Sequence, residues 1–114
     1  MLGNDAMSFI RAKKWKQTES LLKQISKNSG ESLEYFYLKG AYLYSRGNFP
    51  EEKKNIGKAL EINPVHDPSN YVIGMIYTKY RNYDSASEFF GRAANAGTYN
   101  PFYRMNFATT LFLK

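Results

Sequence analysis

The chain has 114 residues, 43% hydrophobic and 23% charged, which is the composition of one globular domain and argues against disorder or a fibrous repeat. It contains no Cys, which excludes disulfides, thiolate metal sites and a cysteine nucleophile. The net charge is +6, and the basic excess lies in residues 1–30, which hold six Lys or Arg and two Asp or Glu.

The start of the chain does not resemble a secretory signal, because residues 1–10 have neither an early basic cluster nor a continuous apolar run. No Asn lies in an N-x-[ST] sequon, and no stretch approaches the roughly 20 apolar residues that a membrane-spanning helix needs. With the absence of Cys, these features favour a cytoplasmic chain without a membrane span.

Apolar residues recur at intervals of three and four along the chain, which is the spacing of amphipathic helices. In chain order, this pattern predicts helices over residues 4–13, 17–28, 32–46, 50–62, 68–81, 84–96 and 101–113. Capping residues and prolines mark helix starts, and glycines mark helix ends. The start signals are Pro50, Asp67–Pro68 and Asn100–Pro101, and the stop signals are Gly30 and Gly97. The short connections make consecutive helices antiparallel neighbours.

The sequence repeats with a period of 34 residues. Gly40 recurs as Gly74, and alanines stand one period before and after them. An aromatic residue recurs in the same way after a short polar turn, at positions Trp15, Phe49 and Tyr83. A glycine inside a helix costs about 1 kcal/mol relative to alanine, so Gly40 and Gly74 predict close contact with a neighbouring helix.

With this period the chain resembles the tetratricopeptide repeat (TPR) family, whose signature is W-x2-L-G-x2-Y, then A-x3-F, a further Ala and Pro. One unit carries Phe36, Gly40, Leu43, Gly47, Phe49, Ile56, Ala59 and Pro64, with Glu52 where a small Ala is expected. The next carries Ile73, Gly74, Tyr77, Tyr83, Ala86, Phe90 and Ala93, with Arg81 in place of the turn glycine. The resemblance implies an all-α, right-handed α-solenoid of antiparallel helix pairs. The expected single domain, 1–114, contains a degenerate unit 1–31, units 32–65 and 66–99, and a half unit 100–114.

The resemblance also implies a protein–protein interaction module, such as an adaptor, a scaffold or a small chaperone. In this family the first helix of each pair lines a concave groove that holds the partner. Counted from Gly40, Gly74 and Ala108, the expected groove residues are Tyr37, Ala41, Tyr44, Ser45, Tyr71, Met75, Thr78, Lys79, Met105, Thr109 and Phe112. Packing between helices is an equal alternative for Tyr37, whereas Tyr44 and Tyr71 are expected to face the groove.

The composition of this predicted groove favours an apolar partner. Its Tyr, Met and Phe side chains suit the apolar face of a helix or an extended hydrophobic segment. The chaperone-adaptor branch of the family binds a C-terminal carboxylate through Lys, Arg and Asn, and those residues are scarce among the expected groove positions. Small secretion chaperones of this class resemble the chain in size and groove character.

A second possible surface is basic. Arg11, Lys13, Lys14 and Lys16 surround Trp15, and basic residues around an aromatic can bind nucleic acid or an anionic membrane. The favoured alternative makes Trp15 a buried turn aromatic with solvated lysines around it.

The sequence offers no candidate for catalysis. His66 is the only histidine, and with no Cys it provides no metal or cofactor site. Its neighbour Asp67 is expected to cap the following helix, and Glu51 and Glu52 are expected on a solvated helix surface. We therefore expect no enzyme, although a non-catalytic regulatory segment of a larger enzyme stays open.

The last predicted helix is rich in apolar residues but has no following helix to cover it. These residues are Phe102, Phe107, Leu111, Phe112 and Leu113. Because solenoids usually end in a polar cap, this helix indicates a piece of a longer array, or a face that pairs with a second copy or a partner.

Overall fold

The computed structural model describes residues 2–97 and 99–114, except for the side chains of residues 2–5 and 49. Every helix or strand in that range is an α-helix. In chain order they are α1 (Leu2–Arg11), α2 (Trp15–Ser29), α3 (Leu33–Arg46), α4 (Phe49–Ile62), α5 (Asp67–Lys79), α6 (Tyr83–Ala94) and α7 (Pro101–Leu113). The all-α prediction is confirmed, and each predicted helix end lies within two residues of the observed one.

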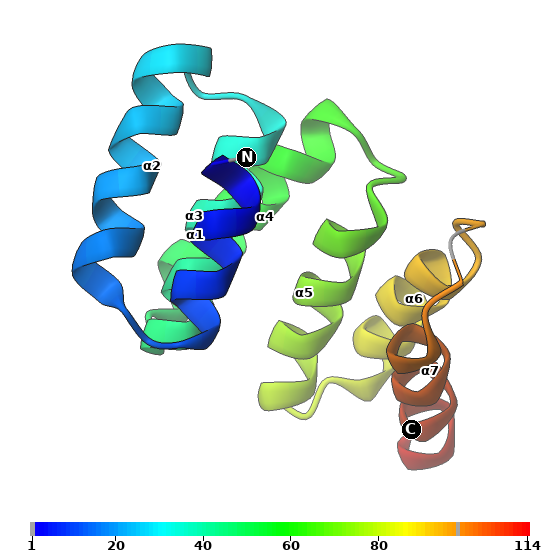
Figure 1. Cartoon of the computed structure of the whole chain (residues 1–114). Coiled ribbons are helices and arrows are strands. Elements are labelled where there is room, and N and C mark those ends of the chain that lie inside the picture. The colour runs from blue at the N-terminus through cyan, green and yellow to red at the C-terminus, as the bar shows by residue number, and fades with distance from the viewer. Residues whose placement is uncertain (1, 98) are drawn as a thin grey trace. The chain divides into compact units, whose positions relative to one another are not determined.

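The helices form two compact units, unit 1 (Met1–Ile62) and unit 2 (Asn63–Lys114). In unit 1, α1 pairs with α2, α3 packs against both, and α4 pairs with α3 (Figure 1). The buried residues at the centre of the first three helices are Ala6, Ile10, Leu22, Ile25, Leu38, Ala41 and Tyr42. The apolar residues spaced at three and four therefore form the core that the sequence pattern predicts.

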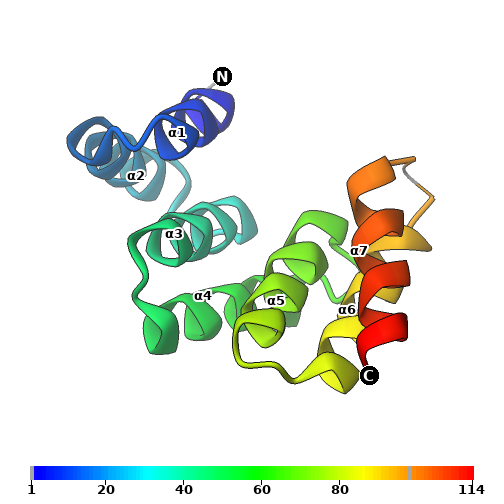
Figure 2. The same ribbon diagram turned by 90° about the horizontal axis from the view of Figure 1, so that it is seen from below.

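In unit 2, α6 packs against both α5 and α7 (Figure 2). Phe90 on α6 is almost completely buried, and Ile76 on α5 and Ala86 and Ala93 on α6 are fully buried. Tyr77 and Phe89 stack across α5 and α6, with ring centroids 5.7 Å apart and planes 12° from parallel. Aromatic contacts of this kind contribute about 0.5–1.5 kcal/mol beyond the apolar area that they bury.

The predicted close contacts at the repeated glycines are confirmed. A Cβ atom on Gly40 would lie 2.5 Å from Cδ1 of Ile56, and one on Gly74 would lie 2.6 Å from Cδ1 of Phe90. Ile56 and Phe90 are themselves one period of 34 residues apart. The repeat is therefore a repeat of contacts, and glycine is present because the paired helix leaves no room for a methyl group.

The turn before the second helix of each pair has a left-handed residue at the same repeat position. Gly47 has φ of 79°, and Lys13 and Arg81, one period before and after it, have φ of 57° and 59°. Lys13 and Arg81 hold a conformation that glycine adopts at less cost. The aromatic expected next to Gly47, Phe49, lies outside the described side chains.

Two expectations for acidic residues are wrong. Glu52 is not on a solvated surface but is 0% exposed. Its position in the 34-residue repeat faces the packed side of the helix, and Thr18 and Ala86, one period before and after it, are also fully buried. Asp67 does not cap α5. His66 is the N-cap residue, and Asp67 is the first helical residue, where its charge favours the helix dipole. The other predicted cap is confirmed, since the Asn100 side chain accepts a hydrogen bond from the Phe102 amide (2.9 Å).

Within residues 2–97 and 99–114, none of the helices is long and apolar enough to cross a bilayer.

Candidate partner-binding site

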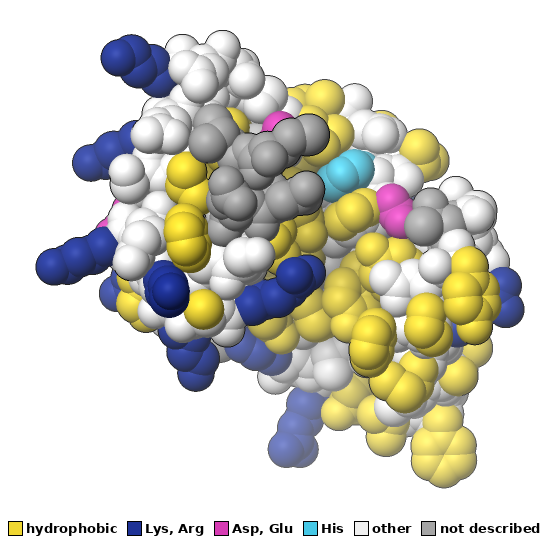
Figure 3. Space-filling model, viewed as in Figure 1, with side chains coloured by type: hydrophobic (Ala, Val, Ile, Leu, Met, Phe, Trp, Pro, Cys, Tyr) yellow, Lys and Arg dark blue, Asp and Glu magenta, His cyan; other side chains and the backbone are white. Residues whose placement is uncertain are grey.

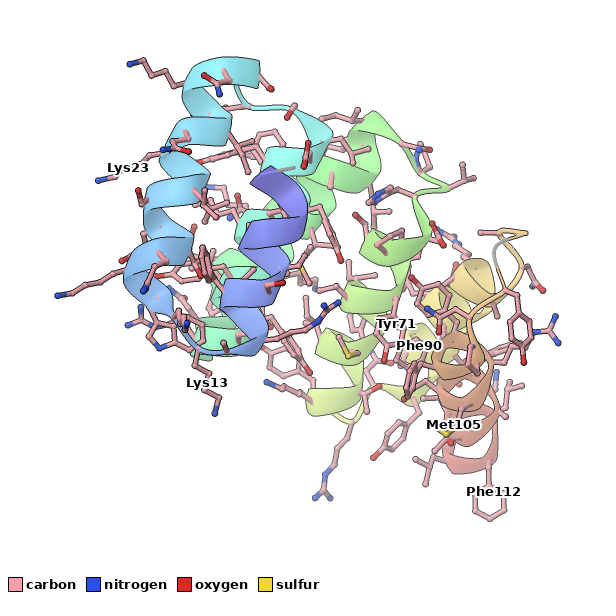
Figure 4. All side chains as sticks on the ribbon, viewed as in Figure 1. Lys13, Lys23, Tyr71, Phe90, Met105 and Phe112 are labelled. Atoms are coloured by element: carbon pink, nitrogen blue, oxygen red, sulfur yellow. The ribbon has the colours of Figure 1, made fainter. Side chains whose placement is uncertain are left out.

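Several highly exposed apolar side chains of unit 2 form a stripe along α7. Phe102, Met105 and Phe112 are 61%, 57% and 88% exposed, and Thr109 lies between Met105 and Phe112. The spacings of three, four and three residues place these four side chains on one side of the helix. Figure 3 shows hydrophobic side chains gathered over α7, and in Figure 4 the ring of Phe112 points away from the ribbon. We call these four residues the α7 stripe.

The opposite side of α7 holds the helix in unit 2. Tyr103 and Thr110 are buried, and Phe107 lies against Gly91 of α6, where an added Cβ would be 3.1 Å from the Phe107 ring. Thr110 donates its hydroxyl hydrogen bond to the Asn106 carbonyl (2.9 Å), so its polar group is satisfied. Because this second face supplies the packing, folding of unit 2 does not require the exposed stripe.

The α7 stripe is largely apolar despite its threonine. The Thr109 hydroxyl donates to the Met105 carbonyl at 2.9 Å, so its donor is satisfied within the helix. From Phe102 to Phe112 the stripe runs about 15 Å along the helix axis. This length matches about three turns of a second helix.

The sequence predicts that Tyr71 faces the groove, and in the structure its side chain is half-buried. Its ring lies 4.8 Å from the Tyr103 ring and 5.5 Å from the Phe90 ring, measured between centroids, so it packs among α5, α6 and α7. Its hydroxyl accepts a hydrogen bond from Nδ2 of Asn106 (3.2 Å). Burial raises the pKa of Tyr71 above its ordinary value of 10.0, and the Asn106 hydrogen bond acts in the opposite direction. Figure 4 shows Tyr71 and Phe90 close together.

The remaining expected groove residues of α5 are Met75, Thr78 and Lys79. Met75 and Thr78 are half-buried, and Lys79 is exposed. The Thr78 hydroxyl donates to the Gly74 carbonyl (2.9 Å), as Thr109 does to Met105 one turn before it. In unit 2, the apolar exposure of the expected set is therefore concentrated on α7.

The expected groove residues of unit 1 are largely occupied by internal packing. Ala41 is 7% exposed and belongs to the core of α1, α2 and α3, so it is not a surface residue. Tyr37 is half-buried against the same core. Tyr44 is half-buried and Ser45 is exposed. The reason is geometric, because α3 packs on α1, α2 and α4.

The basic residues near Trp15 lie at the turn between α1 and α2. Arg11, Lys13, Lys14 and Lys16 are all exposed, and Lys13 extends into solvent in Figure 4. Trp15 itself makes an edge contact with Tyr42 (5.8 Å between centroids) and carries the Arg46 guanidinium 5.3 Å from its centroid. The aromatic that base stacking would need is therefore engaged inside unit 1.

His66 lies at the start of α5. Its Nδ1 is 2.6 Å from the Ser69 hydroxyl oxygen, and burial lowers its pKa below the ordinary value of 6.5, with Asp67 acting in the opposite direction. Among the residues whose side chains are described, no three His, Cys, Asp or Glu side chains come together as a metal-binding group.

One feature with binding chemistry does not appear among the sequence predictions. Lys23, Lys27 and Lys39 line a hollow between α2 and α3. Lys23 and Lys27 are four residues apart on one helix, which signals a shared face, but Lys39 joins them only through the packing of two helices. Gly91 and Phe107, which are in contact, are 16 residues apart, and so are Lys23 and Lys39. This shared spacing is the sequence signal that could have predicted that Lys23 and Lys39 lie close together.

Comparison of the structure with solved proteins decides the fold. The crystal structure of the Sgt2 TPR domain from Aspergillus fumigatus superposes with a TM-score of 0.80 over 97% of this chain and 75% of that one, at 14% sequence identity. The chain has a TPR-like fold. No family model matches the sequence, and no curated protein is detectably similar to it. In the TPR-like fold, α3 and α5 take the place of first helices, α4 and α6 are their second helices, and α7 is a first helix.

Proposed function

We propose that the chain is a protein-interaction module that holds an apolar helical or extended segment of a partner protein against α7. The observation that carries this proposal is the α7 stripe, in which the 88% exposed Phe112 follows Met105 and Phe102 on the side of α7 opposite its packing face. Full burial of a Phe or Met side chain contributes about 1.5–3 kcal/mol to the free energy of binding. The loss of freedom on association offsets part of this contribution. The proposed role is binding without catalysis.

The chemistry of the stripe specifies the kind of segment. Two phenylalanines supply large rigid surfaces, and the flexible thioether of Met105 adapts to side chains of different shapes. With the hydroxyl of Thr109 bonded to its own helix, an incoming segment needs no polar group there. A partner helix with apolar residues at spacings of three and four fits this surface.

Site-specific cross-linking tests the proposal. A photoreactive phenylalanine analogue is placed at Met105 in the full chain, and at Val65 as a control, since Val65 is also in unit 2 and 74% exposed. The proposal predicts that the Met105 position cross-links, in the native cell, to one recurrent apolar segment that the Val65 position does not capture. The segment must then bind purified wild-type chain directly.

Three results would contradict it. Cross-links from Met105 to a second copy of the chain would assign the stripe to self-association. Equal products from Met105 and Val65 would show non-specific capture. If the purified segment does not bind the wild-type chain, the cross-linked protein is not a partner of the α7 stripe.

A further inference from the structure

A hollow of about 520 Å³ lies between α2 and α3 in unit 1. Its lining consists of Glu19, Leu22, Lys23, Ser26, Lys27, Tyr35, Lys39 and Tyr42. Lys39 places its ammonium 5.6 Å from the centroid of the Tyr35 ring. Lys23 lines the hollow and extends toward solvent (Figure 4). The hollow thus combines an apolar wall with lysines that can reach a ligand in it.

The repeat supplies an internal comparison for these lysines. Two periods later, a corresponding hollow of about 500 Å³ lies between α6 and α7 in unit 2. There Gly91, Asn95 and Phe107 stand at the repeat positions of Lys23, Lys27 and Lys39, and all three line the hollow. A Cβ on Gly91 would be 3.1 Å from the Phe107 ring, so this pair of positions faces across the junction of two helices. The fold therefore forms this junction without lysines at these three positions, although Arg92 and Lys114 line the second hollow elsewhere.

Lysines outnumber carboxylates three to one in the lining of this hollow. None of the three lysines forms an ion pair within the part of the chain that the structure describes, whereas Arg92 and Glu88 do, at 2.7 Å. The one carboxylate of the hollow, Glu19, accepts a hydrogen bond from the Tyr42 hydroxyl (2.8 Å). Arg46 donates to the same hydroxyl (2.9 Å), so Glu19 is held at the Tyr42 end. Several ammonium groups around one hollow with a single carboxylate give it a positive potential that attracts anions.

We propose that the hollow between α2 and α3 binds an acidic peptide segment, with its carboxylates on Lys23, Lys27 and Lys39 and an apolar side chain against Leu22 and Tyr35. The volume lies within the range of about 300–1,000 Å³ that is usual for ligand pockets. Glu19 disfavours binding of a nucleic acid, because its continuous phosphate backbone would have to place a negative charge beside the Glu19 carboxylate. A peptide can instead place an uncharged residue there. This site is independent of the α7 stripe.

Fluorescence anisotropy of a labelled peptide tests this site. The probe carries several Asp and Glu residues around a central Leu, and its control has Asn and Gln at the acidic positions. The full chain is compared with a variant in which Lys23, Lys27 and Lys39 are all changed to Gln, and with a matched variant in which Lys13, Lys14 and Lys16 are changed to Gln. Both variants lose the same charge from exposed or half-buried positions, and circular dichroism verifies that both stay helical.

The proposal predicts that the variant changed at Lys23, Lys27 and Lys39 binds the acidic peptide at least about tenfold more weakly than wild type. The matched variant should stay within about threefold of wild type. Equal losses in the two variants would overturn it, because net charge alone would then explain binding. So would absence of peptide binding, equal binding of the Asn and Gln control peptide, or tighter lysine-dependent binding of a single-stranded oligonucleotide or phosphatidylserine vesicles.

A substitution that strengthens binding gives an independent check. Glu19→Gln keeps a hydrogen-bond acceptor for Tyr42 but removes the negative charge of the hollow. This substitution is expected to raise the affinity for the acidic peptide by about two- to fivefold. The combined change Met105→Ser with Phe112→Ser is expected to leave peptide affinity unchanged. Weaker binding after Glu19→Gln, or loss of binding in the α7 variant, would overturn the site.

Discussion

Gly74 of α5 lies directly against the ring of Phe90 of α6, so closely that a Cβ at position 74 would be 2.6–2.7 Å from Cδ1 and Cε1 of that ring. Phe90 is 1% exposed and cannot move aside without disturbing the centre of unit 2. The same relationship joins Gly40 to Ile56 one period earlier. These two contacts set the spacing of a helix pair in each unit.

Gly74→Ala is therefore expected to destabilise the protein. The better helix propensity of alanine contributes up to about 1 kcal/mol, but overpacking against Phe90 costs about 1–3 kcal/mol. Gly57→Ala is the matched control, since nothing lies within 4 Å of its added Cβ, and it is expected to be neutral or stabilising. Urea unfolding measures both, and equal stability of the two variants would contradict the packing.

The left-handed turn residue gives the opposite kind of prediction. Arg81 has φ of 59°, which glycine adopts without strain, so Arg81→Gly is expected to stabilise the protein by about 0.5–1 kcal/mol. Lys54→Gly, at an exposed position inside α4, is expected to destabilise by about 1 kcal/mol. Thermal unfolding distinguishes them, and a destabilised Arg81→Gly variant would show that the arginine side chain matters more than its backbone.

His66 makes stability depend on pH. Because burial lowers its pKa in the folded chain, the unfolded chain binds a proton more readily, and the folded state is favoured at high pH. This contribution is complete above the ordinary pKa of 6.5 and is lost as the pH falls below it. Between about pH 7.5 and pH 5.5, the urea midpoint of the wild type should fall more than that of His66→Gln. Parallel pH profiles would contradict the burial of the imidazole.

Tyr71→Ala is expected to destabilise unit 2 by about 2–4 kcal/mol, because the ring packs on Phe90 and Tyr103. Tyr99→Ala is the matched control, since Tyr99 is 74% exposed and should change stability by less than about 0.5 kcal/mol. Similar unfolding free energies for the two variants would place Tyr71 at the surface. Loss of partner capture by Tyr71→Ala would not identify a binding residue, because folding is affected first.

The sequence was sufficient to predict the helix pairs, because the period that relates Gly40 to Gly74 reports a packing contact that recurs with the same spacing. Helix ends followed from local chemistry, as at Asn100 and Gly30. The environment of Glu52 did not, since its charge suggests solvent while its repeat position faces the packed side. Only the repeat partners Thr18 and Ala86 carry the signal of burial.

The candidate site could be predicted in part. The sequence predicts that Phe112 and Met105 line a concave groove, and the structure exposes both side chains. Tyr71 and Ala41 were assigned to the same face by counting along the repeat, but counting does not show which neighbouring side chains fill the space. Tyr103 and Phe90 reach Tyr71, and the core of α1 to α3 encloses Ala41. The lysines of the α2–α3 hollow come from two helices, so their proximity depends on tertiary packing.

The central claim is that the α7 stripe holds an apolar partner segment. Its most direct test is the affinity of the segment that cross-links at position 105, measured by calorimetry against wild type, against Met105→Ser combined with Phe112→Ser, and against Val65→Ser. All three chains should unfold at nearly the same temperature, because the changed side chains are exposed. The account predicts at least a roughly tenfold loss of affinity for the stripe variant and no loss for Val65→Ser. Equal affinity for all three chains would contradict it.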